Sequence, residues 1–200
     1  TLDDVKALAY TRTAGGYHPR PAEMAAAAWL GSRLPLDPGS ETWAYAGGTG
    51  VSASTLTATQ RTNLDNRNAW YFKEEAGLSF FWQGKVASGG YIDVTRGLDA
   101  FEEDLAKSIF DVLVSASARG EKIPYTDAGV AIISAQVRGA LKRWITRGLF
   151  AEDPVPLVAA PLVASVSGAD KANRLLPDVK FSATLAGAIH KVSIAGVVSL

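Results

Sequence analysis

An acidic cluster is the set of side chains that most readily suggests chemistry. It consists of Asp93, Asp99, Glu102, Glu103 and Asp104. Carboxylates at this spacing could bind a metal ion or supply acid–base catalysis in a hydrolase. The same residues also fall where a helix is expected to begin, and acidic side chains there stabilise the free amides and the helix dipole. We therefore interpret the cluster as solvated helix capping, and we predict no metal site, no cofactor and no enzymatic activity.

Two further motifs have structural explanations. Lys122, Tyr125 and Asp127 lie within six residues, but Thr126 or Asp127 is well placed to cap the helix that follows. The glycines at positions 47, 48 and 50 lack the lysine and hydroxyl residue of a phosphate-binding loop. Neither motif predicts a catalytic or nucleotide-binding site.

Composition limits the classes of function. The chain has 200 residues, with 20 basic and 20 acidic side chains and a net charge of zero, which favours neither a nucleic-acid partner nor a membrane surface. It has no cysteine and two histidines, His18 and His190, which argues against disulfides and against thiolate- or histidine-rich metal sites. The longest apolar stretch is interrupted by Pro156 and Pro161, so no membrane insertion is expected. The sequence starts at Thr1 without an initiator methionine, which suggests a fragment of a longer protein.

A basic set lies on one predicted helix. The apolar stripe of this helix runs from Val130 to Trp144, and the helix ends at Gly148. Its last three turns carry Arg138, Lys142, Arg143 and Arg147. These cations could stabilise the helix dipole and pair with the preceding acidic helix, or they could offer a charged face to an acidic partner. Both readings remain open at this point.

The remaining elements alternate irregularly. A helix is predicted over 20–34, a strand and turn over 40–54, and a short helix from Thr57, whose capping box includes Gln60, to about Asn66. Two or three strands are predicted within 68–94. The clearest helix runs from 98 to 116, and the proline-rich segment 151–178 reads as an extended connector with room for one strand. The order mixes α and β elements without strict βαβ alternation.

The last twenty residues have the pattern of strands. Apolar residues keep odd positions up to Ile189 and even positions after it, so the phase slips at His190 and Lys191. The even-phase residues are Val192, Ile194, Val198 and Leu200. An apolar strand edge without proline or charge normally needs to be covered. We therefore expect the end of the chain to pair with another strand.

Several segments together resemble a known family. They are YHPRPAEMAAAAWLGSRLPLDPGSETWAYAGGTGVSASTLT, ASGGYIDVTRGLD, KIPYTDAGVA, GLFA and LAGAIHKVSIAGVV. In this order and spacing they are similar to the C-terminal region of phage contractile-tail sheath proteins. The resemblance implies an α/β (α+β mixed) fold with a mixed β-sheet flanked by helices. It also implies a sheath-core domain over 1–190, without its N-terminal portion, and a C-terminal β-arm over 191–200.

The resemblance implies a mechanical function. Sheath subunits polymerise around an inner tail tube and contract to drive it through the host envelope. The implied partners are further copies of the chain, the inner tube protein, and baseplate and tail terminator proteins. In this reading the arm residues Val192, Ile194, Val198 and Leu200 add a strand to a neighbour, and the basic set faces the tube. The protein would lie in the contractile tail of the virion, after assembly in the host cytoplasm. The alternatives are another self-assembling tail, baseplate or capsid-like module, or a carboxylate-dependent hydrolase.

Overall fold

The chain forms two compact units. The computed structural model describes residues 1–193, 195 and 196. Unit 1 contains Thr1–Asp37, Glu41–Asp93 and the described residues from Gly187 onward, and unit 2 contains Pro38–Ser40 and Val94–Ala186. The predicted border between a core domain and an arm at residue 191 stays a prediction.

A small mixed sheet forms the centre of unit 1. Its strands are β1 (Gly16–Tyr17), β2 (Trp70–Glu75) and β3 (Leu78–Trp82). β1 pairs with β2 in parallel, and β2 pairs with β3 in antiparallel register, with Phe72 opposite Phe81. Ala76 and Gly77 both have positive φ angles, of 51° and 78°, as a two-residue hairpin turn requires. The predicted mixed sheet in an α+β fold is therefore confirmed.

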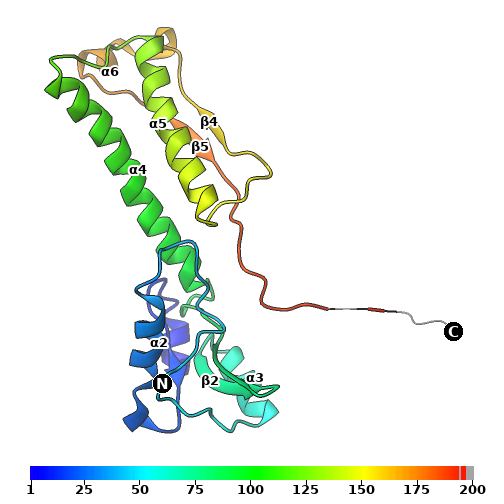
Figure 1. Cartoon of the computed structure of the whole chain (residues 1–200). Helices are drawn as coiled ribbons and strands as arrows, with labels where there is room; N and C mark the ends of the chain where they lie inside the picture. Colours follow the sequence, from blue (N-terminus) through cyan, green and yellow to red (C-terminus); the bar gives the residue numbers. More distant parts are fainter. Residues whose placement is uncertain (194, 197–200) are drawn as a thin grey trace. The chain divides into compact units, whose positions relative to one another are not determined.

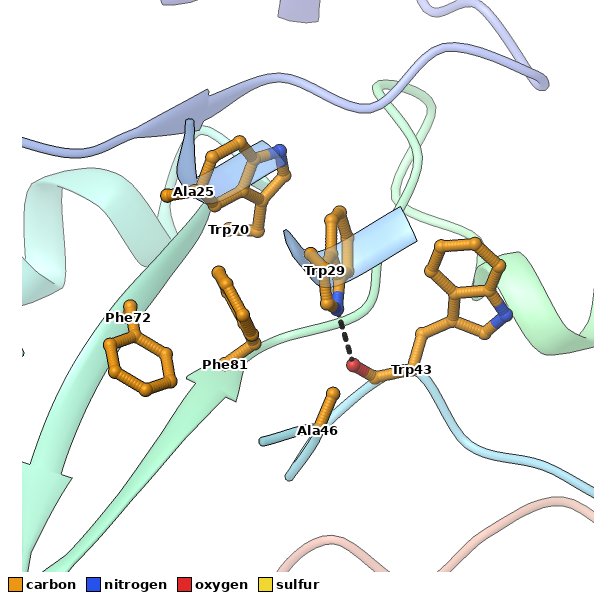
Figure 2. Close-up of a cluster of buried hydrophobic side chains, with 7 residues drawn as sticks. All are labelled: Ala25, Trp29, Trp43, Ala46, Trp70, Phe72 and Phe81. Carbon is orange, nitrogen blue, oxygen red and sulfur yellow. Dashed lines mark hydrogen bonds between the residues drawn. The ribbon is translucent and has the colours of Figure 1, made fainter. Parts of the chain in front are cut away.

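Aromatic side chains from distant parts of the sequence form the core of unit 1 (Figure 2). Trp29 lies at its centre, with ring centroids 5.2 Å from Trp43, 5.4 Å from Trp70 and 5.8 Å from Phe81. Its indole Nε1 donates a hydrogen bond to the backbone carbonyl of Trp43 at 3.0 Å. The buried indole therefore keeps a polar partner while its ring packs against the sheet.

Short helices surround this sheet. They are α1 (Leu2–Ala7), the 3₁₀ turn η1 (Pro21–Glu23), α2 (Ala25–Arg33) and α3 (Ala58–Asp65). The single helix predicted over 20–34 is interrupted at Met24, whose φ of 45° is left-handed and breaks the helical path. The capping box of α3 is confirmed, because Thr57 Oγ1 accepts from the Gln60 amide and the Gln60 side chain accepts from the Thr57 amide.

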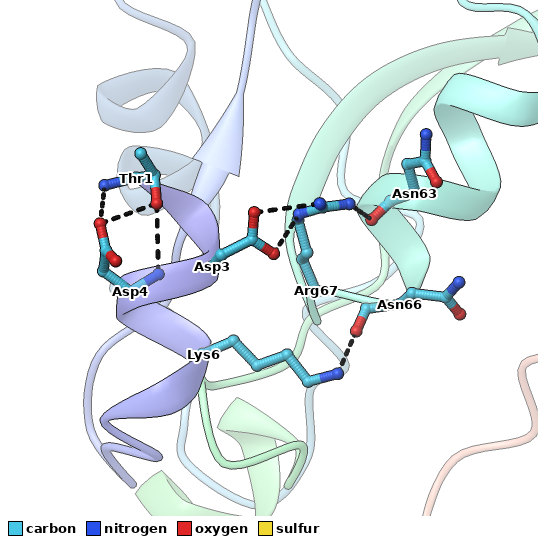
Figure 3. Close-up of polar contacts among 7 residues, drawn as sticks. All are labelled: Thr1, Asp3, Asp4, Lys6, Asn63, Asn66 and Arg67. Atoms are coloured by element: carbon cyan, nitrogen blue, oxygen red, sulfur yellow. Dashed lines mark hydrogen bonds and ion pairs between the residues drawn. The ribbon is translucent and has the colours of Figure 1, made fainter.

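Polar contacts tie α1 to the end of α3 (Figure 3). The guanidinium of Arg67 contacts both carboxylate oxygens of Asp3, with Nε–Oδ1 at 2.7 Å and Nη2–Oδ2 at 3.0 Å. Lys6 donates to the backbone carbonyl of Asn66. A bidentate arginine–carboxylate pair fixes orientation better than a single ion contact, so these bonds align the first helix with α3.

Unit 2 is built on two long helices. Its elements are α4 (Ile92–Ala118, whose first two residues belong to unit 1), α5 (Asp127–Thr146), β4 (Leu157–Ala159), η2 (Val163–Ser165), α6 (Gly168–Ala172) and β5 (Lys180–Ser182). Figure 1 shows α5 running beside α4 in the opposite direction, with β4 and β5 along α5. Phe101 on α4 packs against Trp144 on α5 and against Phe150, with ring centroids at 6.0 and 5.0 Å. The predicted apolar stripes of both helices therefore meet in one core.

Three sequence predictions need correction. No strand forms within 40–54, where Ala46 makes an isolated bridge to Phe81 and Tyr45 has a left-handed φ of 61°. α4 begins at Ile92, earlier than the helix start predicted at residue 98, whereas β2 and β3 agree with the two or three strands predicted within 68–94. The connector 151–178 contains β4 but also η2 and α6, which begins at its cap Ser167.

Candidate functional site

The two-stranded sheet of unit 2 is the first candidate assembly surface. β4 and β5 are antiparallel, with Leu157 opposite Ser182 and Ala159 opposite Lys180. Each strand has one strand neighbour among the described residues, so the outer side of each presents an unpaired edge. Leu157 is exposed on this sheet. Such an edge can accept a further strand.

The chain leaves this sheet through a short bridge and then extends. Leu185 forms an isolated bridge with Phe150, and the Ala186 amide donates to the carbonyl of Leu149 at 2.9 Å. Residues 187–193 have no strand partner among the residues that the structure describes. Ile189 and Val192 are 83% and 75% exposed. Among the predicted arm residues, Ile194, Val198 and Leu200 lie outside the described residues, so the arm remains a prediction.

The basic set on α5 divides into two kinds of cation. Arg143 is bound within unit 2, since its Nη2 lies 2.9 Å from Asp104 Oδ2 and 2.6 Å from Ser108 Oγ. Arg147 places its guanidinium 4.8 Å from the ring centroid of Trp144. Both therefore stabilise the packing around α5, as the structural reading of these cations predicts.

Arg138 and Lys142 form the other kind. Both are exposed, and neither makes an ion pair within the residues that the structure describes. They border a groove whose floor is largely apolar. Its lining residues are Arg138, Leu141, Lys142, Ile145, Thr146, Glu152, Val155 and Pro156. Two cations beside exposed apolar surface suit an acidic, partly apolar partner.

Within the acidic cluster, Asp104 makes contacts that link α4 to α5. It receives hydrogen bonds from Arg143 and from Trp144 Nε1, the latter at 2.9 Å. Partial removal from water raises the pKa of Asp104, but the hydrogen bonds from Trp144 and Arg143 outweigh this and bring the pKa below its usual value. Asp104 therefore stays ionised and holds α4 against α5.

The rest of the acidic cluster does not converge. Because α4 begins at Ile92, Asp93 lies in its first turn, while Asp99, Glu102 and Glu103 are exposed further along the helix. The prediction that the whole cluster is solvated capping of the helix start is therefore wrong: only Asp93 lies in the first turn, and it is buried rather than solvated. Within residues 1–193, 195 and 196, no three histidine or acidic side chains are grouped so that they could hold a metal ion.

The segment before α5 has the predicted capping role. Thr126 Oγ1 accepts a hydrogen bond from the Gly129 amide, so Thr126 is the N-cap. The Tyr125 hydroxyl donates to the Leu175 carbonyl at 2.7 Å, and Asp127 accepts from the Val163 amide at 2.8 Å. These side chains are occupied in tertiary contacts, which supports their structural interpretation.

Sequence reasoning missed the partners of His190. Its Nε2 lies 2.8 Å from Thr42 Oγ1, and the Tyr45 hydroxyl donates to its backbone carbonyl. The rings of Trp82 and Tyr91 also lie beside it. About 100 to 150 positions separate His190 from these residues, so no local pattern could have indicated the contact.

The family comparison matches the two long helices. Residues 92–153 match the family model described as E217 tail sheath protein gp31-like, C-terminal domain. This range contains all of α4 and α5 and continues to the start of the connector. No curated protein matches the chain. No helix among the described residues is long and apolar enough to cross a membrane.

Two solved structures share the fold of the chain. One is a chain of the anti-feeding prophage (AFP) helical sheath in its contracted state, with a TM-score of 0.58, 16% identity, and coverage of 94% of this chain and 54% of that one. The other is a chain of the AFP baseplate, with a TM-score of 0.62, 14% identity, and coverage of 86% and 48%. The chain thus spans about half the length of the solved chains it matches. The family match confirms, over residues 92–153, the resemblance to contractile-tail sheath proteins that the sequence predicts, and the solved structures show that the fold is shared over most of the chain.

Proposed function

We propose that this chain, whose residues 92–153 carry a tail sheath C-terminal domain, forms the body of a contractile-tail sheath subunit. The family match over α4 and α5 is the observation that carries this proposal. The fold shared with the contracted AFP sheath supports it over most of the chain. The subunit polymerises around an inner tail tube and contracts to drive the tube through the host envelope. It is a structural part of the virion, assembled in the host cytoplasm, and needs no cofactor.

Strand addition is the proposed link between copies. The arm residues are Val192, Ile194, Val198 and Leu200. The edge of β4 or β5 supplies the acceptor, because each strand has one neighbour in the described part of the chain. Main-chain hydrogen bonds give affinity in this mode, and alternate apolar side chains set the register. Such links can persist while weaker contacts between subunit bodies exchange during contraction.

Deletion of residues 192–200 from the full-length protein tests this link. Folded monomers should remain, because the described residues of this segment contribute no buried side chain. Sheath tubes should be lost in electron micrographs. The matched control is Ser193→Ala with Ser199→Ala, which keeps every apolar residue of the arm and should still form tubes. Tubes of normal length from the deletion variant would contradict the link.

The groove beside Arg138 and Lys142 is the proposed tube contact. These two cations support it best, since Arg143 and Arg147 are already bound to Asp104 and Trp144. The expected partner surface is acidic with some apolar side chains, which would complement the exposed cations and the groove floor.

Charge reversal tests the tube contact. Arg138→Glu with Lys142→Glu should weaken co-assembly with the tube protein, and it should leave the thermal unfolding midpoint close to wild type because both side chains are exposed. Lys107→Glu reverses another exposed cation, on α4, and serves as the control. Equal tube-templated assembly by the double variant and the control would exclude this surface.

A second candidate is a sheath-fold subunit of the baseplate. The fold shared with a chain of the AFP baseplate favours this alternative. Immunogold labelling of purified particles distinguishes the two functions. A sheath subunit is labelled along the whole tail, whereas a baseplate subunit is labelled at one end.

A further inference from the structure

Within residues 187–193, His190 is the only half-buried residue, and the others are exposed. It is half-buried, whereas its neighbours Ile189 and Val192 are 83% and 75% exposed. An extended segment with no strand partner in the described part of the chain would normally be held by several apolar side chains. Here the apolar side chains point to solvent and a single polar ring points into unit 1.

Four residues of unit 1 surround this ring. Thr42 contacts His190 Nε2 through its hydroxyl at 2.8 Å, and the Tyr45 hydroxyl donates to the His190 carbonyl. The Tyr91 ring meets the imidazole edge to face, with centroids 5.1 Å apart at 81°, and the Tyr45 ring does so at 5.9 Å and 81°. Trp82 lies at 6.4 Å. Both the side chain and the backbone of His190 are therefore held.

The backbone of Tyr45 is strained. Its φ of 61° is left-handed, which is rare and unfavourable for a bulky side chain. The Tyr45 amide donates to the Phe81 carbonyl at 2.8 Å, and its ring packs on Phe80 and Trp82 at 5.1 and 5.4 Å. These contacts over-determine the strained geometry. As a result the Tyr45 hydroxyl contacts His190, while Tyr45 as a residue is still 43% exposed.

The phenol of Tyr45 keeps its proton. Partial removal from water, followed by the nearby charge of Glu75, raises the pKa of Tyr45 above its usual value. The hydroxyl therefore remains a hydrogen-bond donor. Lys191, the next residue along the chain, places its Nζ 5.8 Å from the centroid of Trp82 and adds a cation–π contact at the rim.

We propose that Thr42, Tyr45, Trp82 and Tyr91 form a docking socket on unit 1 for the chain's own C-terminal segment, with His190 as the anchor. The socket fixes the backbone and side chain of His190 on unit 1, while the exposed side chains of Ile189 and Val192 remain available to contact another chain. Its use in assembly rests on the proposed sheath function. There, a fixed exit point shortens the free part of the arm and raises its effective concentration near a neighbouring edge.

Distance measurements between spin labels test the socket in the 200-residue monomer. The chain has no cysteine, so Asn63→Cys on α3 and Ser193→Cys beside the anchor can be labelled uniquely. Both positions are exposed. Double electron–electron resonance should give one narrow distribution of the distance between the two spin labels, because both labels are then fixed to unit 1.

Two substitutions should abolish the narrow distribution. His190→Ala removes the anchor. Tyr45→Gly removes the ring and hydroxyl of the socket and is compatible with the left-handed backbone, so unit 1 should still fold, as checked by circular dichroism. Ile189→Ala is the matched control and should retain the narrow distribution, because this side chain is exposed.

The proposal is overturned by a broad distribution in the unsubstituted background, or by a narrow one that survives either His190→Ala or Tyr45→Gly. This measurement uses monomers alone. Loss of tube formation on deleting residues 192–200 is a separate result, so the socket and the sheath function can fail independently.

Discussion

The cores of unit 1 and unit 2 are built from different kinds of contact. In unit 1, Trp29 is enclosed by side chains that are 14 to 52 positions away in the sequence, and much of the supporting backbone is irregular. In unit 2, two long amphipathic helices joined by a short loop supply most of the core, and a polar contact from Asp104 reinforces it. Distant aromatic packing thus defines one unit, and local helical pattern defines the other. The residues that match the sheath family model, 92–153, include both of these long helices.

The largest effect is expected from Trp29→Ala in unit 1. Trp29 is 2% exposed, so the substitution leaves a cavity among the three aromatic rings that pack against it. The free energy of unfolding should fall by about 3–5 kcal/mol, as for other buried tryptophans. Urea unfolding followed by circular dichroism measures it.

Phe110→Ala is the control for this substitution. Phe110 is also a large aromatic residue, but it is 64% exposed on α4. Its loss should change the free energy of unfolding by no more than about 0.5 kcal/mol. Similar losses from both variants would mean that aromatic enclosure does not define the core of unit 1.

A smaller effect is expected from Asp104→Asn in unit 2. The substitution keeps the shape of the side chain but removes the charge that Arg143 and Trp144 contact. The side chains of Arg143 and Asp104 are 46% and 31% exposed, so solvent weakens the pair. The free energy of unfolding at pH 7 should fall by about 1 kcal/mol.

The contribution of Asp104 to the free energy of unfolding should depend on pH. Because the pKa of Asp104 is lowered on folding, the unfolded chain binds its proton more readily, and the contribution to stability is present above the unfolded pKa. It is lost as the pH falls below about 4, the usual value for aspartate. The difference in unfolding free energy between wild type and Asp104→Asn should therefore shrink from pH 7 to pH 3 in urea titrations. A difference that stays constant over this range would show that the charge of Asp104 does not hold the helices.

The difference between local helical pattern and distant packing also explains what could be predicted from the sequence. The apolar stripe from Val130 to Trp144 places α5 within a few residues of its observed bounds, since each contact repeats locally every three or four positions. The strand predicted over 40–54 is wrong because the left-handed Tyr45 interrupts it, and that geometry is held by Phe81 from a distant strand. For the candidate site, the basic set was visible in the sequence. Which of these cations are bound within unit 2, and which residues contact His190, depends on tertiary contacts. Local spacing in the sequence does not predict such contacts.

An effect of similar size tests whether a local sequence pattern also contributes to the stability of unit 1. Four consecutive residues predict the capping box of α3, and Thr57→Ala removes the hydroxyl that accepts from the Gln60 amide at 3.3 Å. Loss of an N-cap of this kind should lower the free energy of unfolding by about 1 kcal/mol. The control is Thr62→Ala in the same helix, whose hydroxyl donates to the Ala58 carbonyl at 3.0 Å and caps nothing. It should cost less than about 0.5 kcal/mol, because an exposed threonine is a poorer helix former than alanine. If urea unfolding shows equal losses for the two variants, the cap contributes nothing beyond helix propensity, and unit 1 owes its stability to distant packing alone.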